Sequence, residues 1–249
     1  MLTLSILMPC YKGEDFIENS IEIVEKEVSL FEKNFELIVI IDGFVDNAYK
    51  KAKALEKEYK NLKVIGYEKN KGKGHAIKYG LKYCQGEYVA FLDSDLDYHP
   101  KALKWFLKIA KEKEADLVIG NRKDKNSIYK YPLMRKMASL GFNIYVNFLF
   151  PELKSHDTQA GIKLIKRKKA LESFNYFENQ QGIYGFIFDI YLLVLARKLN
   201  LKIIQAPCIF EMKSSTIGKG KKFFKTAYKM GKEVWKFKQN FYKGFLNEK

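Results

Sequence analysis

The sequence predicts an α/β fold in which a mostly parallel sheet is flanked by helices. Through the first 120 residues, short apolar runs alternate with polar, Lys/Glu-rich segments of helical composition. Strands that alternate with helices of this length are typical of βαβ units, whose parallel strands are covered on both faces. The 249 residues are enough for one large domain or two small ones with a sizeable core.

Five apolar runs in the first half predict the strands of this sheet. They are Leu4–Met8, Leu37–Ile41, Val64–Gly66, Tyr88–Leu92 and Leu117–Ile119. The segments between them predict helices over Asp15–Phe31, Asp46–Tyr59, Gly74–Cys84 and Pro100–Lys113. Asp46 suits an N-cap, and Pro100 suits the first helical position because a proline lacks the N–H that would be unpaired there.

The second half of the chain is less regular. Tyr131–Phe150 is rich in aromatic and aliphatic residues and is expected to be helical. Gly185–Leu199 predicts another helix, and Lys202–Ala206 predicts a short strand that Pro207 stops. Between them lies His156–Lys163, a polar insert with one glycine.

The net charge of +16 predicts an anionic partner, which could be nucleic acid, a membrane surface or a phosphorylated substrate. Cys10, Cys84 and Cys208 lie far apart and predict neither a disulfide framework nor a zinc site, which fits a reducing compartment. Leu2–Pro9 is too short for a signal peptide and lacks a basic start. No stretch reaches about 18 uncharged apolar residues, so we expect no transmembrane helix.

The basic tail, Ile217–Lys249, holds ten lysines and two glutamates, a net charge of +8. Its aromatic and aliphatic residues recur at roughly helical spacing, with lysines on the other faces. Such a basic amphipathic helix with Trp and Phe on its apolar side is typical of membrane interfaces. The alternative is a terminal helix docked on the domain with a solvated lysine face. We therefore expect a domain over residues 1–216 and a membrane-interface helix over 217–249.

Three acids follow the strand Tyr88–Leu92 at alternating positions: Asp93, Asp95 and Asp97. If the extended geometry continues, alternate residues point the same way, and the three carboxylates face one point. Several hard oxygens at one point suit Mg²⁺ or Mn²⁺, and such an ion suits a diphosphate. The alternative is a capping and turn cluster ahead of Pro100, although one cap needs only one acid.

Asp42 and the loop Asn70–His75 are the next candidates. Asp42 follows an apolar strand, where an acid can accept hydrogen bonds from a nucleotide base or ribose; the alternative is a turn aspartate. The loop combines two glycines with cations before a helix, so its amides and lysines could approach phosphates. It has neither the spacing nor the terminal Ser/Thr of a Walker loop, and the alternative is a plain charged turn.

Taken together, these motifs resemble family 2 glycosyltransferases of the Rossmann-like GT-A fold, most closely the dolichyl-phosphate mannose and glucose synthase branch. The resemblance covers about residues 3–213. Its matching stretches are Ser5–Tyr11, Ile41–Asp46, Asn70–Ala76, Asp93–Pro100, Gly120–Arg122, Pro132–Asn143 and Asp157–Lys163. Asp93-Ser94-Asp95 is similar to the Asp-x-Asp metal motif, and Asp157–Lys163 is similar to the Asp-Thr-Gln-Cys-Gly-Phe-Lys stretch of the glucosyl enzymes.

This resemblance implies inverting, metal-dependent transfer of a hexose from a sugar nucleotide of the UDP-glucose or GDP-mannose type to a polyprenyl or dolichyl phosphate. The net charge of +16 and the basic tail predict that the enzyme is peripheral on the cytoplasmic face of the cell membrane, at an anionic surface. The resemblance implies Mg²⁺ or Mn²⁺ as cofactor, held by Asp93, Asp95 and Asp97. The implied nucleotide-binding residues are Pro9, Tyr11, Asp42, Lys73, Gly74, Asp93, Ser94 and Lys213. The implied catalytic residues are Asp95, Asp157, Arg122 and Arg135.

The chain also departs from the pattern of this branch. Ile41 and Phe44 replace an Asp and a Ser, Tyr191 replaces the Glu of a Phe-Asp-Val-Glu stretch, and Lys213 stands where an arginine is usual. Arginine and lysine are not equivalent phosphate ligands, so donor details or the acceptor could differ.

The acceptor class decides whether a general base is needed. A hydroxyl acceptor needs a base, whereas a phosphomonoester is already largely anionic at pH 7, its second pKa being about 6. A phosphate acceptor therefore needs cations more than a base, and Asp157 could act as a base without being required to. The second hypothesis is a GT-A enzyme acting on a glycan or lipid hydroxyl. A nucleic-acid-binding protein is disfavoured, because the three acids would repel phosphates and no recognised nucleic-acid motif occurs.

Overall fold

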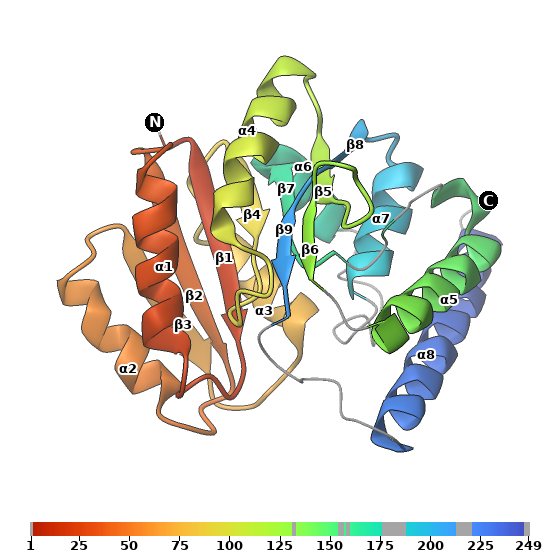
Figure 1. The fold of residues 1–249 in the computed structure, drawn as a ribbon, viewed down its shortest axis with the longest axis horizontal. Helices are drawn as coiled ribbons and strands as arrows, with labels where there is room; N and C mark the ends of the chain where they lie inside the picture. The colour runs from red at the N-terminus through yellow and green to blue at the C-terminus, as the bar shows by residue number, and fades with distance from the viewer. Residues whose placement is uncertain are drawn as a thin grey trace.

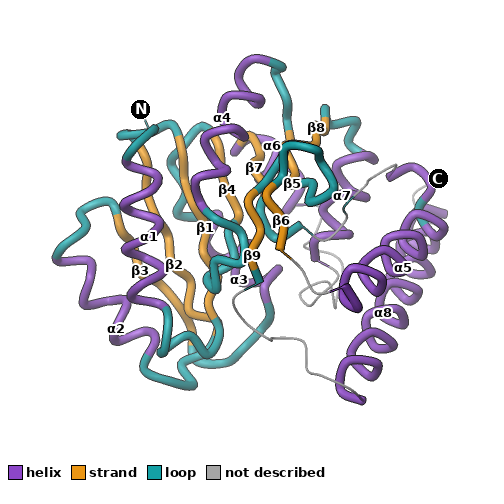
Figure 2. Tube along the Cα trace, in the orientation of Figure 1, coloured by secondary structure: helices purple, strands orange, loops and turns teal. Residues whose placement is uncertain are grey.

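A seven-stranded sheet forms the centre of the molecule, in the order β3-β2-β1-β4-β7-β5-β8 (Figures 1 and 2). The computed structural model describes residues 2–130, 133–153, 157, 160–175, 188–212 and 221–246. The strands are β1 (Leu4–Cys10), β2 (Phe35–Asp42), β3 (Leu62–Tyr67), β4 (Tyr88–Phe91), β5 (Leu117–Gly120), β7 (Lys163–Lys166) and β8 (Ile203–Ala206). All neighbouring strands are parallel except β7, which runs antiparallel to both β4 and β5.

Helices cover both faces of this sheet, because alternate residues of each strand point to opposite sides. Ile6 and Met8 pack with helices α1 (Ile17–Ser29), α2 (Ala48–Ala54) and α4 (Leu103–Glu112). Leu7 points to the other face, which is covered by α3 (Lys73–Leu81), α5 (Leu133–Leu149), α6 (Arg167–Asn175), α7 (Phe188–Lys198) and α8 (Lys221–Leu246). Short 3-10 turns η1 (Leu55–Lys57), η2 (Pro100–Ala102) and η3 (Pro151–Leu153) and a second sheet of β6 (Ile128–Lys130) and β9 (Ile209–Glu211) complete the described elements.

The predicted α/β fold is confirmed, and all five strands predicted in the first half are present. Strand β7 was not predicted, because Lys163–Lys166 places only two apolar residues between lysines at the end of a polar insert. Its strand conformation comes from pairing on both sides, with Phe91 of β4 and Ile119 of β5 opposite Lys163.

The middle of α8 is docked on the domain. Val234 and Phe237 are buried, and the Phe237 ring lies 5.3 Å from that of Phe150 and 5.0 Å from that of Tyr191. The Tyr145 hydroxyl of α5 donates a hydrogen bond to the Gly231 carbonyl at 3.1 Å. These contacts match the docked alternative for the middle of the basic tail, and contact of the tail with a membrane stays a prediction. Helices α5 and α8 lie side by side at one end of the molecule (Figure 1). Across the described ranges, no helix has the length and apolar character needed to span a bilayer.

Candidate active site

The candidate residues converge at the carboxyl edge of the sheet, the lower edge in Figure 1. Strand β1 lies between β2 and β4, and all three are parallel, so their carboxyl ends meet at this edge. Asp42 ends β2, Asp93 comes two residues after β4, and Lys73 begins α3. Ligands of open α/β sheets bind at this edge, so the fold itself places the candidates where a substrate can reach them.

Asp42 holds the glycine-rich loop in place. Its carboxylate is buried and accepts hydrogen bonds from Asn70 Nδ2 at 2.8 Å, the Lys71 amide at 2.7 Å and the Gly72 amide at 2.9 Å. Gly72 has a φ of 90°, in the region where a side chain is strained. Asp42 therefore fixes the start of α3 and the position of Lys73. Its contact with a nucleotide stays a prediction.

The segment Asp93–Asp97 is a turn, which corrects the expectation of a continued extended strand. The Leu96 amide donates to the Asp93 carbonyl at 3.1 Å, and Leu96 itself has a φ of 52°. The Asp97 amide donates to Asp95 Oδ1 at 3.2 Å, and Ser20 Oγ of α1 donates to the Ser94 carbonyl at 2.7 Å. The three acids thus do not share a face by strand alternation. Within the described parts of the chain, no three acidic, histidine or cysteine side chains gather at one point.

The acids nevertheless fit a hard divalent cation, by the chemistry of their donors. Burial, with Asp93 and Asp97 nearby, raises the pKa of Asp95 to about 6. Negative charge is therefore concentrated at this turn, and carboxylate oxygens are the ligands that Mg²⁺ and Mn²⁺ prefer. Asp93 and Asp95 are the residues that would hold such an ion, and Asp97 as a third ligand stays a prediction.

Lys73 faces this turn. Its Nζ lies 2.7 Å from Asp93 Oδ1 and 3.5 Å from Asp189 Oδ2 at the start of α7. Burial alone would lower the pKa of Lys73, but Asp189 and Asp93 raise it above its ordinary value. A Cβ atom on Gly161 would lie 2.2 Å from Asp93 Oδ2, so the absence of a side chain at position 161 gives this carboxylate its space.

Arg122 and Asp157 form a bidentate ion pair next to this edge. Arg122 Nε donates to Asp157 Oδ2 at 2.6 Å, Nη2 donates to Oδ1 at 2.8 Å, and the Arg122 amide donates to Oδ2 at 3.2 Å. Their side chains are only 9% and 5% exposed, and the guanidinium carbon lies 5.3 Å from the centre of the Phe210 ring. The sequence predicted both residues for the site but not their pairing, which holds the Asp157 carboxylate on two sides.

Of the remaining predicted residues, the structure describes Pro9, Tyr11 and Gly74 fully. Pro9 is in β1, Tyr11 follows it with 46% of its surface exposed, and Gly74 is buried in α3. Arg135 belongs to α5, but its side chain lies outside the description, as does all of Lys213.

Two residues beside the candidate site, Lys163 and Asp189, were missed from the sequence. Lys163 of β7 is fully buried, and its Nζ lies 2.6 Å from Asp189 Oδ1. It also donates to the Ala160 carbonyl. Asp189 could have been identified from the sequence, because it is an acid within an apolar run. An acid in a buried helix usually has a charged partner.

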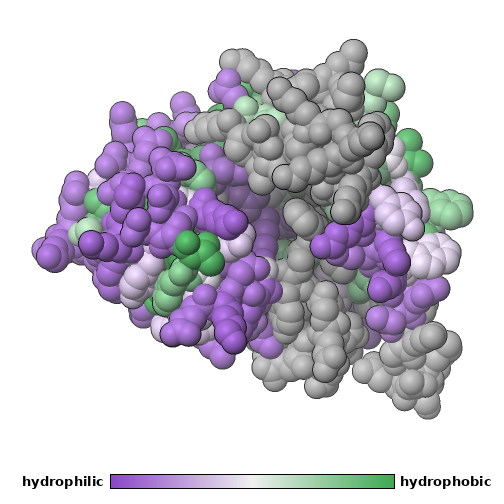
Figure 3. Space-filling model, turned by 90° about the horizontal axis from the view of Figure 1, so that it is seen from below, coloured by the Kyte–Doolittle hydropathy of each residue, from purple (hydrophilic) through white to green (hydrophobic). Residues whose placement is uncertain are grey.

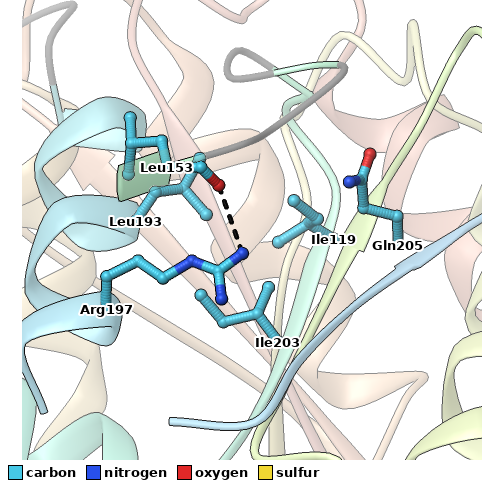
Figure 4. Close-up of a pocket in the computed structure, with 6 residues that line it drawn as sticks. All are labelled: Ile119, Leu153, Leu193, Arg197, Ile203 and Gln205. Atoms are coloured by element: carbon cyan, nitrogen blue, oxygen red, sulfur yellow. Dashed lines mark hydrogen bonds between the residues drawn. The ribbon is translucent and has the colours of Figure 1, made fainter. Parts of the chain in front are cut away.

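A cavity of about 80 Å³ lies away from these acids, between α7, η3 and strands β5 and β8 (Figure 4). Arg197 Nη2 donates to the Leu153 carbonyl at 3.2 Å, and Arg197 Nε and Gln205 Oε1 are buried without a partner among the described residues. Pockets for ligands the size of a sugar nucleotide usually measure about 300–1,000 Å³. This cavity is therefore too small to be the donor site.

The fold and the carboxyl-edge acids define a glycosyltransferase domain of the GT-A type. A model of the family "Glycosyl transferase family 2" matches residues 5–174, and the chain belongs to this family. Apart from Leu4, the match covers every strand of the seven-stranded sheet except β8, together with Lys73, Asp93 and the Arg122–Asp157 pair.

Curated relatives agree with this family assignment, and a solved structure agrees with the fold. The chain is 26% identical over 226 residues to a dolichyl-phosphate beta-glucosyltransferase of Saccharomyces cerevisiae, covering 82% of this chain and 65% of the relative. It is 30% identical over 213 residues to one of Trichomonas vaginalis, covering 82% and 64%. The chain thus spans just under two thirds of the length of these relatives. Glucosyl-3-phosphoglycerate synthase from Mycobacterium tuberculosis, crystallised with Mn²⁺ and UDP, shares the fold with a TM-score of 0.67 and 19% identity, over 95% of this chain and 80% of that one.

Proposed function

We propose that this protein transfers a hexose, with glucose from UDP-glucose as the favoured donor, to a polyprenyl or dolichyl phosphate. The observation that best supports this proposal is the bidentate ion pair between Arg122 and Asp157, which lies next to the edge of the sheet where Asp93 is found. A carboxylate held on two sides by a guanidinium is poorly suited to take a proton from a hydroxyl. A phosphate acceptor brings its own negative charge and needs no base. The names of the curated relatives support the same acceptor.

Each half of the reaction has its own residues in this proposal. Lys73 and the amides at the start of α3 would face the donor diphosphate, with Asp42 holding their loop. A divalent cation at Asp93 and Asp95, when bound, would stabilise the negative charge of the leaving diphosphate. Arg122 would contribute positive charge on the acceptor side. We infer direct, single-displacement inversion at the anomeric carbon.

A donor and acceptor screen tests this function. UDP- and GDP-hexoses are offered with a short polyprenyl phosphate, with Mn²⁺, with Mg²⁺ and with EDTA, and the lipid product is measured. We expect transfer from UDP-glucose that stops in EDTA, and UDP should raise the melting temperature only when the metal is present. Transfer to the unphosphorylated polyprenol alone would favour the hydroxyl-acceptor hypothesis, and DNA binding without nucleotide binding would contradict both.

We further propose that the protein works at the cytoplasmic face of the cell membrane as a peripheral enzyme. One face of α5 exposes four large apolar residues at helical spacing: Met137, Leu140, Ile144 and Phe148. The neighbouring α8 exposes Tyr228 and Trp235 among lysines. Seen from below, hydrophobic residues occur together with hydrophilic ones on the side where α5 and α8 lie (Figure 3). Apolar side chains beside basic ones favour an anionic lipid surface.

A matched pair of substitutions distinguishes membrane contact through α5 from nonspecific adsorption by any exposed apolar residue. Phe148→Ser on α5 is expected to lower binding to anionic vesicles about tenfold. Moving one phenylalanine side chain from water into the lipid contributes about 1.5 kcal/mol or more to binding. Leu30→Ser changes a residue of nearly equal exposure, 74% against 76%, next to α1. It should leave vesicle flotation unchanged. Equal losses in both variants, or none in either, would refute membrane contact through α5.

A further inference from the structure

Four charged side chains of alternating sign run from the core to the candidate diphosphate site. They come from four separate elements: Lys163 of β7, Asp189 of α7, Lys73 of α3 and Asp93 after β4. The nitrogen–oxygen distances along this series are 2.6 Å, 3.5 Å and 2.7 Å. Their side chains are 2%, 15%, 25% and 33% exposed in the same order, so the series leads outward to the site.

Asp189 is the central member of this series, because it contacts both lysines. Its Oδ1 pairs with Lys163, and its Oδ2 faces Lys73. Without a negative charge at this point, the two ammonium groups would repel each other at short range in a partly buried place. The Asp189 carboxylate therefore offsets the positive charge of both lysines.

The outer pair, Lys73 and Asp93, is more exposed to solvent than the inner pair, Lys163 and Asp189. Lys163 is buried and also donates to the Ala160 carbonyl, so it is fixed. Lys73 and Asp93 are the two most exposed members, and Asp93 is also an expected metal ligand. A cation on Asp93 would compete with Lys73 for the same carboxylate, since like charges at one oxygen disfavour each other.

We propose that Asp189 is a positioning residue, which retains Lys73 beside the donor diphosphate once Asp93 no longer pairs with it. Lys73 exchanges its Asp93 partner for a phosphate oxygen and keeps Asp189 throughout. The inference rests on the proposed function, because it assigns Lys73 to a nucleoside diphosphate.

A double-mutant cycle on UDP binding tests this role. The dissociation constant for UDP in the presence of Mn²⁺ is measured for the unchanged protein, Lys73→Met, Asp189→Asn and the double variant. We expect about tenfold weaker binding for Lys73→Met, the scale of one charged hydrogen bond. Asp189→Asn should lose nearly as much, the double variant should bind no more weakly than Lys73→Met, and Asp189→Glu should restore part of the affinity. Losses that multiply in the double variant, or unchanged binding in Asp189→Asn, would overturn the proposal.

A control variant separates positioning from a general loss of stability. Asp116 pairs with Lys166 at 3.1 Å at the opposite edge of the sheet, with similar exposure of 19% and 33%. Asp116→Asn should leave UDP affinity unchanged, and melting temperatures are recorded for every variant. UDP losses in Asp116→Asn equal to those in Asp189→Asn would refute a specific role. No UDP binding by the unchanged protein, with or without Mn²⁺, would remove the proposed function and this inference with it.

Discussion

Replacing Asp95 with asparagine is expected to lower hexosyl transfer on the order of 10³-fold. Asp95 lies in a turn where negative charge is concentrated, and its carboxylate is one of the two that would hold the cation. Removing it costs the stabilisation of the leaving diphosphate, which is worth several kcal/mol. The measurement is the rate of transfer from labelled UDP-glucose, together with the Mn²⁺ dependence of UDP-induced stabilisation.

Asp97→Asn is the matched control for this prediction. Asp97 shares the turn, and its backbone carbonyl accepts a hydrogen bond from the Glu211 amide at 2.9 Å, which the substitution preserves. A loss within tenfold would restrict the metal ligands to Asp93 and Asp95, whereas a loss as large as that of Asp95→Asn would identify a third ligand. Full activity and unchanged metal dependence in Asp95→Asn would contradict the metal site.

Asp157→Asn is expected to destabilise the protein by about 3–5 kcal/mol, because it leaves the buried Arg122 guanidinium without its counter-charge. A loss of this size lowers the melting temperature of a chain of this length by roughly 10 °C. The measurement is thermal and denaturant unfolding. The double variant Arg122→Gln/Asp157→Asn removes both charges and should recover part of the loss; no recovery would mean that the pair is not the source of the stability.

The same variant distinguishes the two acceptor classes. Where Asp157→Asn remains folded, turnover with a polyprenyl phosphate should stay within about tenfold, because such an acceptor is already ionised. A fall of several orders of magnitude in kcat with unchanged KM would identify Asp157 as a general base and favour a hydroxyl acceptor.

The sequence was sufficient for the parallel half of the fold, because β1 to β5 are apolar runs separated by helices and each is recognisable by itself. Strand β7 could not be predicted from the sequence, since Lys163–Lys166 forms a strand by pairing with β4 and β5. The order of the strands and the antiparallel insertion likewise depend on contacts between distant segments.

Within the site, the residue types were predictable and their pairings were not. Asp93, Asp42 and Arg122 stand out by their places after strands, but nothing local indicates that Asp42 binds loop amides or that Arg122 clamps Asp157. The replacement at Tyr191 has a packing explanation: this side chain is 1% exposed and contacts Phe237 of α8, where a glutamate would be buried without water.

Strand β7 has a consequence for how this protein could be altered. The stretch from Asp157 to Lys163 enters β7, and within it Asp157 meets Arg122, Gly161 makes room for Asp93, and Lys163 pairs with Asp189. Under the proposed function, this one short stretch contributes residues to both the donor side and the acceptor side of the site. A chimaera that imports this stretch from a relative would carry a donor preference and an acceptor preference together.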